Sequence, residues 1–139
     1  MRVTEMNEKQ FAAEAENLAE VMTYVQDGLK EAGCPPQTLR QILLAVEEIF
    51  VNIAHYAYRG EKGFVTVKYA RLDSPARYAL WFCDAGVPFD PTARDAPDIS
   101  TDLRNRQIGG LGIFLVREMM DKMTYTRENG RNIIYIEKQ

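Results

Sequence analysis

The stretch Ile42–Ala54, ILLAVEEIFVNIA, has the pattern that decides how this chain folds. Ten of its thirteen residues are apolar and they surround the helix axis, so this helix motif predicts a helix that is buried on most of its surface. Glu48 and Asn52 lie one turn apart and share a face. Together they can orient a water or hydroxyl and offer a hard oxygen ligand to Mg²⁺. The alternative interpretation is a polar stripe whose hydrogen bonds are satisfied within the protein.

The segments around the helix motif predict an α+β fold. Apolar residues at helical spacing indicate a first helix over 12–30, which Gly33 ends before a second helix runs from about Pro36 to Tyr58. The spacing of apolar residues, the turn residues and the lengths of the segments predict the remaining elements. They are a short edge strand at 1–6, strands at 63–71 and 77–84, a helix at 111–122, and a hairpin of 123–128 with 131–137. This order predicts a two-layer sandwich, with helices on one face of a mixed, mostly antiparallel sheet.

Composition limits the class of protein. The chain has 139 residues, 46% of them hydrophobic, and a net charge of −3, which suits one domain with a real core. It shows no basic run for nucleic acid, no apolar stretch long enough to span a membrane and no signal peptide at its start. The two cysteines, Cys34 and Cys83, are far apart and indicate reduced packing residues of a cytoplasmic protein. With a single histidine, they form no transition-metal cluster.

A second motif, the strand-end motif Asp84–Pro91 (DAGVPFDP), comes where the strand 77–84 ends. Asp84 at a strand end can point its carboxylate into a pocket, and Gly86 lets the backbone approach a ligand closely. The alternative is an ordinary proline-containing turn with the aspartate as an Asx cap.

A third motif, the glycine motif Ile108–Val116 (IGGLGIFLV), places three glycines directly before an apolar helix. Consecutive backbone N–H groups at a helix start form an anion site, which the helix dipole reinforces. It matches neither of the common phosphate-binding fingerprints, and tight packing of helix on sheet is the alternative explanation. The unpatterned stretch 85–108, which begins within the strand-end motif and reaches the glycine motif, has the length of a lid or binding loop.

The three motifs in this order resemble the GHKL ATPase superfamily, which has the Bergerat fold, over about Leu18–Glu137. Within it the chain is similar to the single-domain bacterial anti-sigma-factor serine/threonine kinases. The resemblance implies Glu48 as general base or hydroxyl-positioning group, Asn52 as the Mg²⁺ ligand, and Asp84 as acceptor of a hydrogen bond from the adenine amino group. It implies that Gly86 lets adenine lie against the backbone. The implied phosphate-binding positions are Gly109, Gly110, Leu111, Gly112 and Ile113.

The sequence departs from the family pattern at two positions. Pro88 stands where a second glycine is common in the strand-end motif, and Asn132 lies where many members have threonine near the adenine, although its amide can still form hydrogen bonds. His55 follows Asn52 by three residues, and we expect it to be a hydrogen-bonded structural histidine rather than a catalytic one.

The resemblance implies an ATP-dependent serine/threonine kinase that phosphorylates a STAS-domain anti-anti-sigma protein and regulates a sigma factor. Residues 1–139 would form one ATP-binding kinase domain, with 85–110 as the ATP lid, and the family implies a homodimer. Arg104 and Arg106 in the lid could close over the γ-phosphate or be solvated charges. The alternative function is a module that sequesters a partner, with ATP as a structural ligand. A detached histidine-kinase catalytic domain is disfavoured, because the only histidine, His55, directly follows the helix motif.

Overall fold

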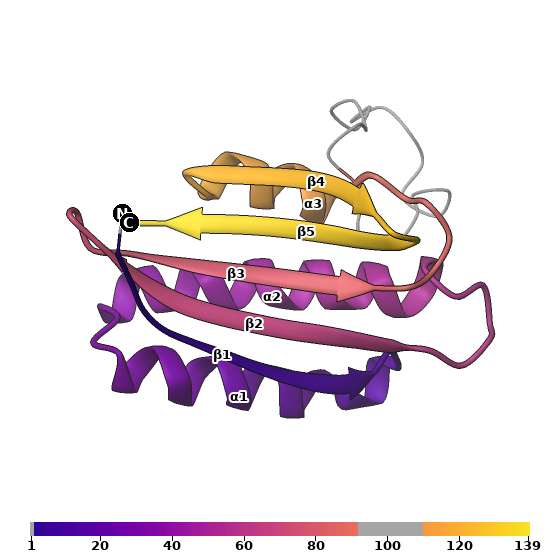
Figure 1. The fold of residues 1–139 in the computed structure, drawn as a ribbon, viewed down its shortest axis with the longest axis horizontal. Coiled ribbons are helices and arrows are strands. Elements are labelled where there is room, and N and C mark those ends of the chain that lie inside the picture. The colour runs from indigo at the N-terminus through magenta and orange to yellow at the C-terminus, as the bar shows by residue number, and fades with distance from the viewer. Residues whose placement is uncertain (1, 92–109) are drawn as a thin grey trace.

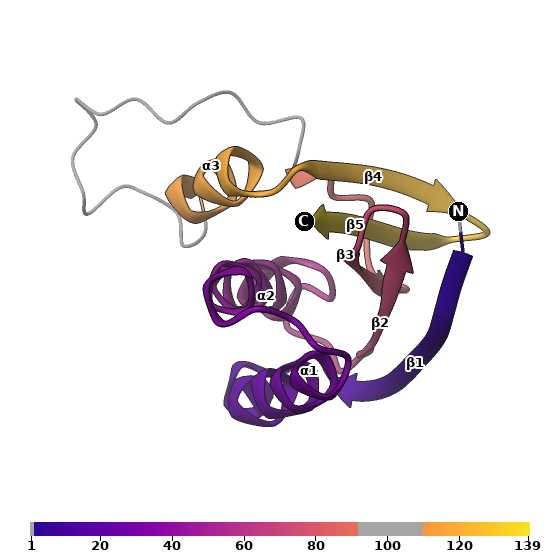
Figure 2. The same ribbon diagram turned by 90° about the vertical axis from the view of Figure 1, so that its left-hand side faces the viewer.

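Five strands form one sheet in the order β1-β2-β3-β5-β4, and every pairing among them is antiparallel. The computed structural model describes residues 2–91 and 110–139. Figure 2 shows the helices α1, α2 and α3 on one side of the sheet, which confirms the predicted α+β sandwich. The elements are β1 (Arg2–Ala12), the 3-10 turn η1 (Ala15–Asn17), α1 (Leu18–Glu31), α2 (Pro36–Tyr56), β2 (Phe64–Asp73), β3 (Arg77–Asp84), α3 (Gly110–Met119), β4 (Lys122–Glu128) and β5 (Arg131–Lys138).

The amino-terminal boundary is the main difference from the sequence-based expectation. The edge strand predicted at 1–6 extends to Ala12, which pairs with Phe64, and α1 begins at Leu18 instead of residue 12. Phe11 is buried in the core opposite Val65, so pairing along β2 outweighs the helical spacing of the alanines that follow.

The boundaries of the two long helices follow local chemistry. Gly33 has a φ of +90°, and the N–H of Cys34 donates to the Leu29 carbonyl, which closes α1 with a Schellman motif. Pro36 opens α2 at a position that needs no N–H donor. The second helix ends at Tyr56, two residues earlier than predicted, because Arg59 and Gly60 turn the chain with positive φ.

The core lies between α2 and the sheet. Figure 1 shows α2 running behind the middle strands, and its buried residues confirm the helix motif as the centre of the fold. They are Leu39, Ile42, Ala45, Val46, Ile49, Phe50, Asn52 and Ile53.

The carboxyl-terminal hairpin places β5 beside β3. Asn129 and Gly130 both have positive φ, as a two-residue type I′ turn requires, and the predicted hairpin is confirmed. The register sets Asn132 opposite Asp84 on β3 and opposite Arg127 on β4. The predicted lid at 85–110 falls largely outside the described residues. No helix in the described ranges is long and apolar enough to cross a membrane.

The burial of α2 gives a direct stability test with a matched control. Ile42→Ala removes a side chain with 0% exposure and should lower the free energy of unfolding by about 2–5 kcal/mol. Leu44→Ala, two residues along, removes a side chain that is 53% exposed and should change it by less than about 0.5 kcal/mol. Urea denaturation of both variants measures the difference. Equal effects would contradict the packing described for α2.

Candidate functional site

Glu48 lies against the start of α3, so the helix motif and the glycine motif meet in space. Figure 2 shows α3 beside α2. A Cβ placed on Gly112 would come within 1.8 Å of the Glu48 Oε2 atom, which shows that the carboxylate occupies the space left by the missing side chain. Burial, and secondarily the neighbouring Glu47 carboxylate, raise the pKa of Glu48 above its ordinary value. A carboxylate with a raised pKa suits proton transfer near neutral pH.

Asn52 offers an oxygen that nothing else in the described ranges uses. The residue is 1% exposed, and its Nδ2 donates to the Glu48 backbone carbonyl at 2.8 Å. Its Oδ1 is buried and, within the described part of the chain, has no hydrogen-bond partner. Buried polar atoms are almost always paired, so an orphaned amide oxygen needs a reason, and a hard cation such as Mg²⁺ fits it.

The described residues contain no group of three histidine, cysteine or carboxylate side chains that could hold a metal ion. A Mg²⁺ ion at Asn52 would therefore complete its coordination with water and substrate phosphates, which is the usual arrangement for Mg²⁺ at phosphoryl-transfer sites. The residues present are compatible with this ion.

Asp84 ends β3 with its carboxylate buried at 4% exposure. Its Oδ1 accepts hydrogen bonds from the Gly86 N–H at 2.8 Å and from Asn132 Nδ2 at 2.9 Å. The first of these is the Asx cap of the alternative interpretation, which the structure confirms. That the carboxylate also points into a ligand pocket stays a prediction. Both bonds use Oδ1. Burial raises the pKa of Asp84, against the lowering effects of Asn132, Gly86 and Arg127.

Gly86 is required by packing in this structure. A Cβ there would lie 2.1 Å from the Ala57 carbonyl oxygen, and the next N–H, that of Val87, donates to the same carbonyl at 2.8 Å. The turn after β3 is therefore fixed to the carboxyl-terminal end of α2. That Gly86 also lets adenine approach the backbone stays a prediction.

Sequence reasoning did not find Arg127 and Tyr125. Arg127 Nη1 donates to the Gly86 carbonyl and to Asn132 Oδ1, both at 3.0 Å, and the Tyr125 hydroxyl donates to Asn132 Oδ1 at 2.5 Å. The Asn129-Gly130 turn was the available signal, since a two-residue hairpin fixes Arg127 opposite Asn132.

Three polar residues are buried in the described ranges: Asn52 on α2, Asp84 at the end of β3 and Asn132 on β5. Of the other predicted positions, Gly110 and Leu111 begin α3, and Ile113 is a core residue at 2% exposure. His55 is exposed next to Tyr56. Gly109, Arg104 and Arg106 lie outside the described residues.

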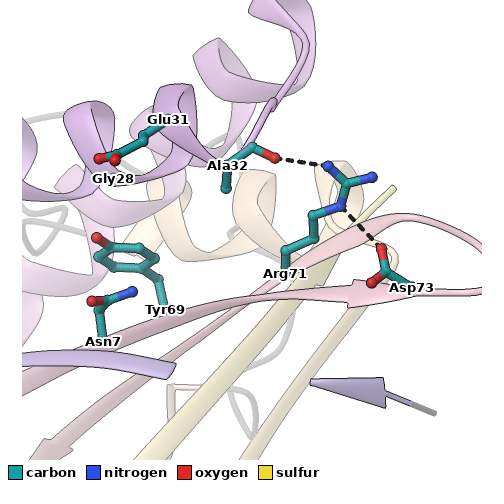
Figure 3. A pocket seen from close by; sticks show the side chains of 7 residues that line it. All are labelled: Asn7, Gly28, Glu31, Ala32, Tyr69, Arg71 and Asp73. Carbon is teal, nitrogen blue, oxygen red and sulfur yellow. Dashed lines mark hydrogen bonds and ion pairs between the residues drawn. The ribbon is translucent and has the colours of Figure 1, made fainter. Parts of the chain in front are cut away.

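Of two cavities in the described structure, one lies beside the strand-end motif and the other lies away from the predicted site. One of about 490 Å³ is bounded by the turn after β3, the end of α2 and β4; it is lined by Ala57, Tyr58, Arg59, Glu61, Ala85, Gly86, Val87, Pro88 and Arg127. The other, of about 590 Å³, lies between the end of α1 and strands β1 and β2 (Figure 3). It contains none of the predicted residues, and its Arg71 is bonded to Asp73 and to the Ala32 carbonyl.

Comparison with known proteins identifies a family and named relatives. The family model for the histidine kinase-like ATPase domain matches residues 11–138. The chain is 28% identical to the serine-protein kinase RsbW of Listeria monocytogenes serovar 1/2a over 108 residues, which cover 74% of this chain and 68% of the relative. It is 22% identical to the serine-protein kinase RsbW of Bacillus cereus strain G9842 over 139 residues, which cover 95% of this chain and 86% of the relative.

The contact between Glu48 and Gly112 can be tested by a double-mutant cycle. Alanine is ordinarily up to about 1 kcal/mol better than glycine in a helix, but Gly112→Ala should lose this gain because its Cβ displaces the Glu48 carboxylate. In a Glu48→Ala background the collision is absent and Gly112→Ala should stabilise the protein. A coupling above about 0.5 kcal/mol in urea denaturation confirms the contact, and additive effects would contradict it.

Proposed function

The chain belongs to the histidine kinase-like ATPase family, and from this premise we propose that it binds ATP with Mg²⁺ and transfers the γ-phosphoryl group to a serine or threonine of a partner protein. One observation carries the proposal. The Glu48 carboxylate lies against Gly112 at the start of α3, which is far from it in the sequence. One helical turn from Glu48, the buried Asn52 Oδ1 has no hydrogen-bond partner among the described residues. This is the set of groups that phosphoryl transfer needs: a proton acceptor, a cation ligand and an anion-binding helix start.

In the proposed reaction, the partner hydroxyl oxygen forms a bond to the γ-phosphorus while the bond from that phosphorus to the bridging oxygen of ADP breaks. Glu48 accepts the hydroxyl proton, and its raised pKa favours this exchange. Asn52 Oδ1 would hold Mg²⁺, which neutralises phosphate charge when bound. The N–H groups at the start of α3 would bind the phosphates. The products are ADP and a phosphorylated partner.

The proposed partner is a STAS-domain anti-anti-sigma protein, and through it a sigma factor would be regulated. The two relatives described above are named serine-protein kinases, which favours serine as the acceptor. A homodimer, a cytoplasmic location and a lid formed by 85–110 belong to the same proposal. A protein that only sequesters its partner would bind ATP without transferring phosphate, so the two functions differ in one measurable product.

The first test is nucleotide binding. Wild-type protein should bind ATP more tightly with Mg²⁺ than without it in isothermal titration. Asn52→Ala should lose this dependence on Mg²⁺, because it removes the buried amide oxygen that has no partner among the described residues and that would bind the ion. Leu44→Ala, exposed on the same helix, is the control and should behave as wild type. ATP binding that ignores Mg²⁺ in the wild type would contradict the role of Asn52.

The second test separates catalysis from binding. Glu48→Gln keeps the shape of the side chain but cannot take a proton, so phosphate transfer to the partner should fall by at least about 100-fold while ATP affinity is retained. Radiolabelled ATP measures the transfer. Because burial and Glu47 raise the pKa of Glu48, the wild-type rate should fall as the pH drops through that pKa.

Glu47→Gln is the matched control for this experiment. It should retain transfer and move the acidic limb of the pH profile to lower pH, since it removes a negative charge beside Glu48. Full transfer by Glu48→Gln would show that Glu48 is not the base. ATP binding without any transfer by the wild type would favour the sequestering function.

A further inference from the structure

The Asn132 side chain uses every hydrogen bond that an amide can make. Its Nδ2 donates to Asp84 Oδ1 at 2.9 Å and to the Val87 carbonyl at 2.8 Å. Its Oδ1 accepts from Arg127 at 3.0 Å and from the Tyr125 hydroxyl at 2.5 Å. Two donors and two acceptor sites are the full capacity of a carboxamide, so Asn132 has none left for a ligand.

These four partners allow a single orientation of the amide. Rotated by 180°, its oxygen would face the Asp84 carboxylate and the Val87 carbonyl, which only accept, and its NH₂ would face the Arg127 guanidinium, which only donates. Asn132 is also 2% exposed, so water cannot replace a lost partner. The amide therefore fixes the Asp84 carboxylate relative to the turn and to β4.

The same contacts leave Asp84 with one oxygen for a ligand. Oδ1 is occupied by Asn132 and Gly86, while Oδ2 accepts no hydrogen bond from the described residues. Arg127 is a positive charge near the Asp84 carboxylate. The residues paired with Asp84 on the neighbouring strands, Asn132 on β5 and Val65 on β2, are uncharged. An ionised carboxylate is an acceptor only, so a base that presents an N–H group at Oδ2 is bound and one that presents a carbonyl is repelled.

We propose that Asn132, with Arg127 and Tyr125 behind it, acts as a positioning group that makes Asp84 select purine nucleotides with a 6-amino group over those with a 6-oxo group. The inference rests on the proposed function, since it assumes that this site binds a nucleotide. A threonine hydroxyl could not make these four bonds, which gives a physical reason for an asparagine at this position of the chain.

Isothermal titration with ATP and with inosine triphosphate, which carries a 6-oxo group, tests the proposal in the intact protein. Wild type should prefer ATP by roughly 100-fold or more. Asn132→Asp keeps the shape but places a second carboxylate against Asp84 Oδ1, so the two carboxylates will share a proton, which lowers the negative charge at Oδ2 and with it the repulsion of a 6-oxo group. At pH 6 the preference should fall at least tenfold, and it should recover as the pH is raised and the proton is lost.

Arg127→Met is the second variant. It removes the positive charge and the two hydrogen bonds that Arg127 donates, to the Gly86 carbonyl and to Asn132 Oδ1, and it keeps Asn132 itself. It should also lower the preference for ATP, whereas Thr126→Ala, the exposed neighbour on β4, should leave it unchanged. A purely structural role would weaken the two nucleotides equally and leave their ratio as in the wild type. An unchanged ratio in both variants therefore overturns the inference while the proposed function stands. Binding of neither nucleotide by the wild type overturns both.

Discussion

The structure depends on burying α2 along most of its surface while keeping Glu48 and Asn52 at its carboxyl-terminal half. An apolar helix packs against the sheet because removal of its side chains from water is the main favourable term in folding. A carboxylate and an amide in the same helix are costly to bury unless they are partnered. The chain accepts this cost where Gly112, at the start of α3, leaves room for the Glu48 carboxylate.

Desolvation gives the region its chemical character. Burial raises the pKa of both Glu48 and Asp84, but their surroundings differ. Glu48 faces another carboxylate and a helix start without a side chain, which suits a group that gains and loses a proton. Asp84 has two donors and a nearby guanidinium, which suits a group that stays ionised and accepts hydrogen bonds. Two carboxylates are thus directed to different tasks by the groups around them.

At two of the predicted glycines, Gly86 and Gly112, a neighbouring group occupies the space that a side chain would need. At Gly86 the Ala57 backbone fills the space of a Cβ, and at Gly112 the Glu48 side chain fills it. The consequences of substitution differ, because a backbone cannot move aside and a flexible carboxylate can. The first glycine fixes a turn to α2, and the second fixes where a functional group lies.

Local chemistry in the sequence determined most of the elements: the period of α2, the stops at Gly33 and Pro36, and the Asn129-Gly130 hairpin depend on neighbours within a few residues. The order of the three motifs likewise identified Glu48, Asn52 and Asp84 as candidates. Only the tertiary structure decided that β1 continues to Ala12, because its pairing with β2 is a contact between distant residues. It also decided that Asn52 Oδ1 has no partner among the described residues, and that Asn132 bonds to Arg127, Tyr125 and Asp84. Hydrogen bonds between strands depend on register and burial, and neither has a signature in the residues taken one at a time.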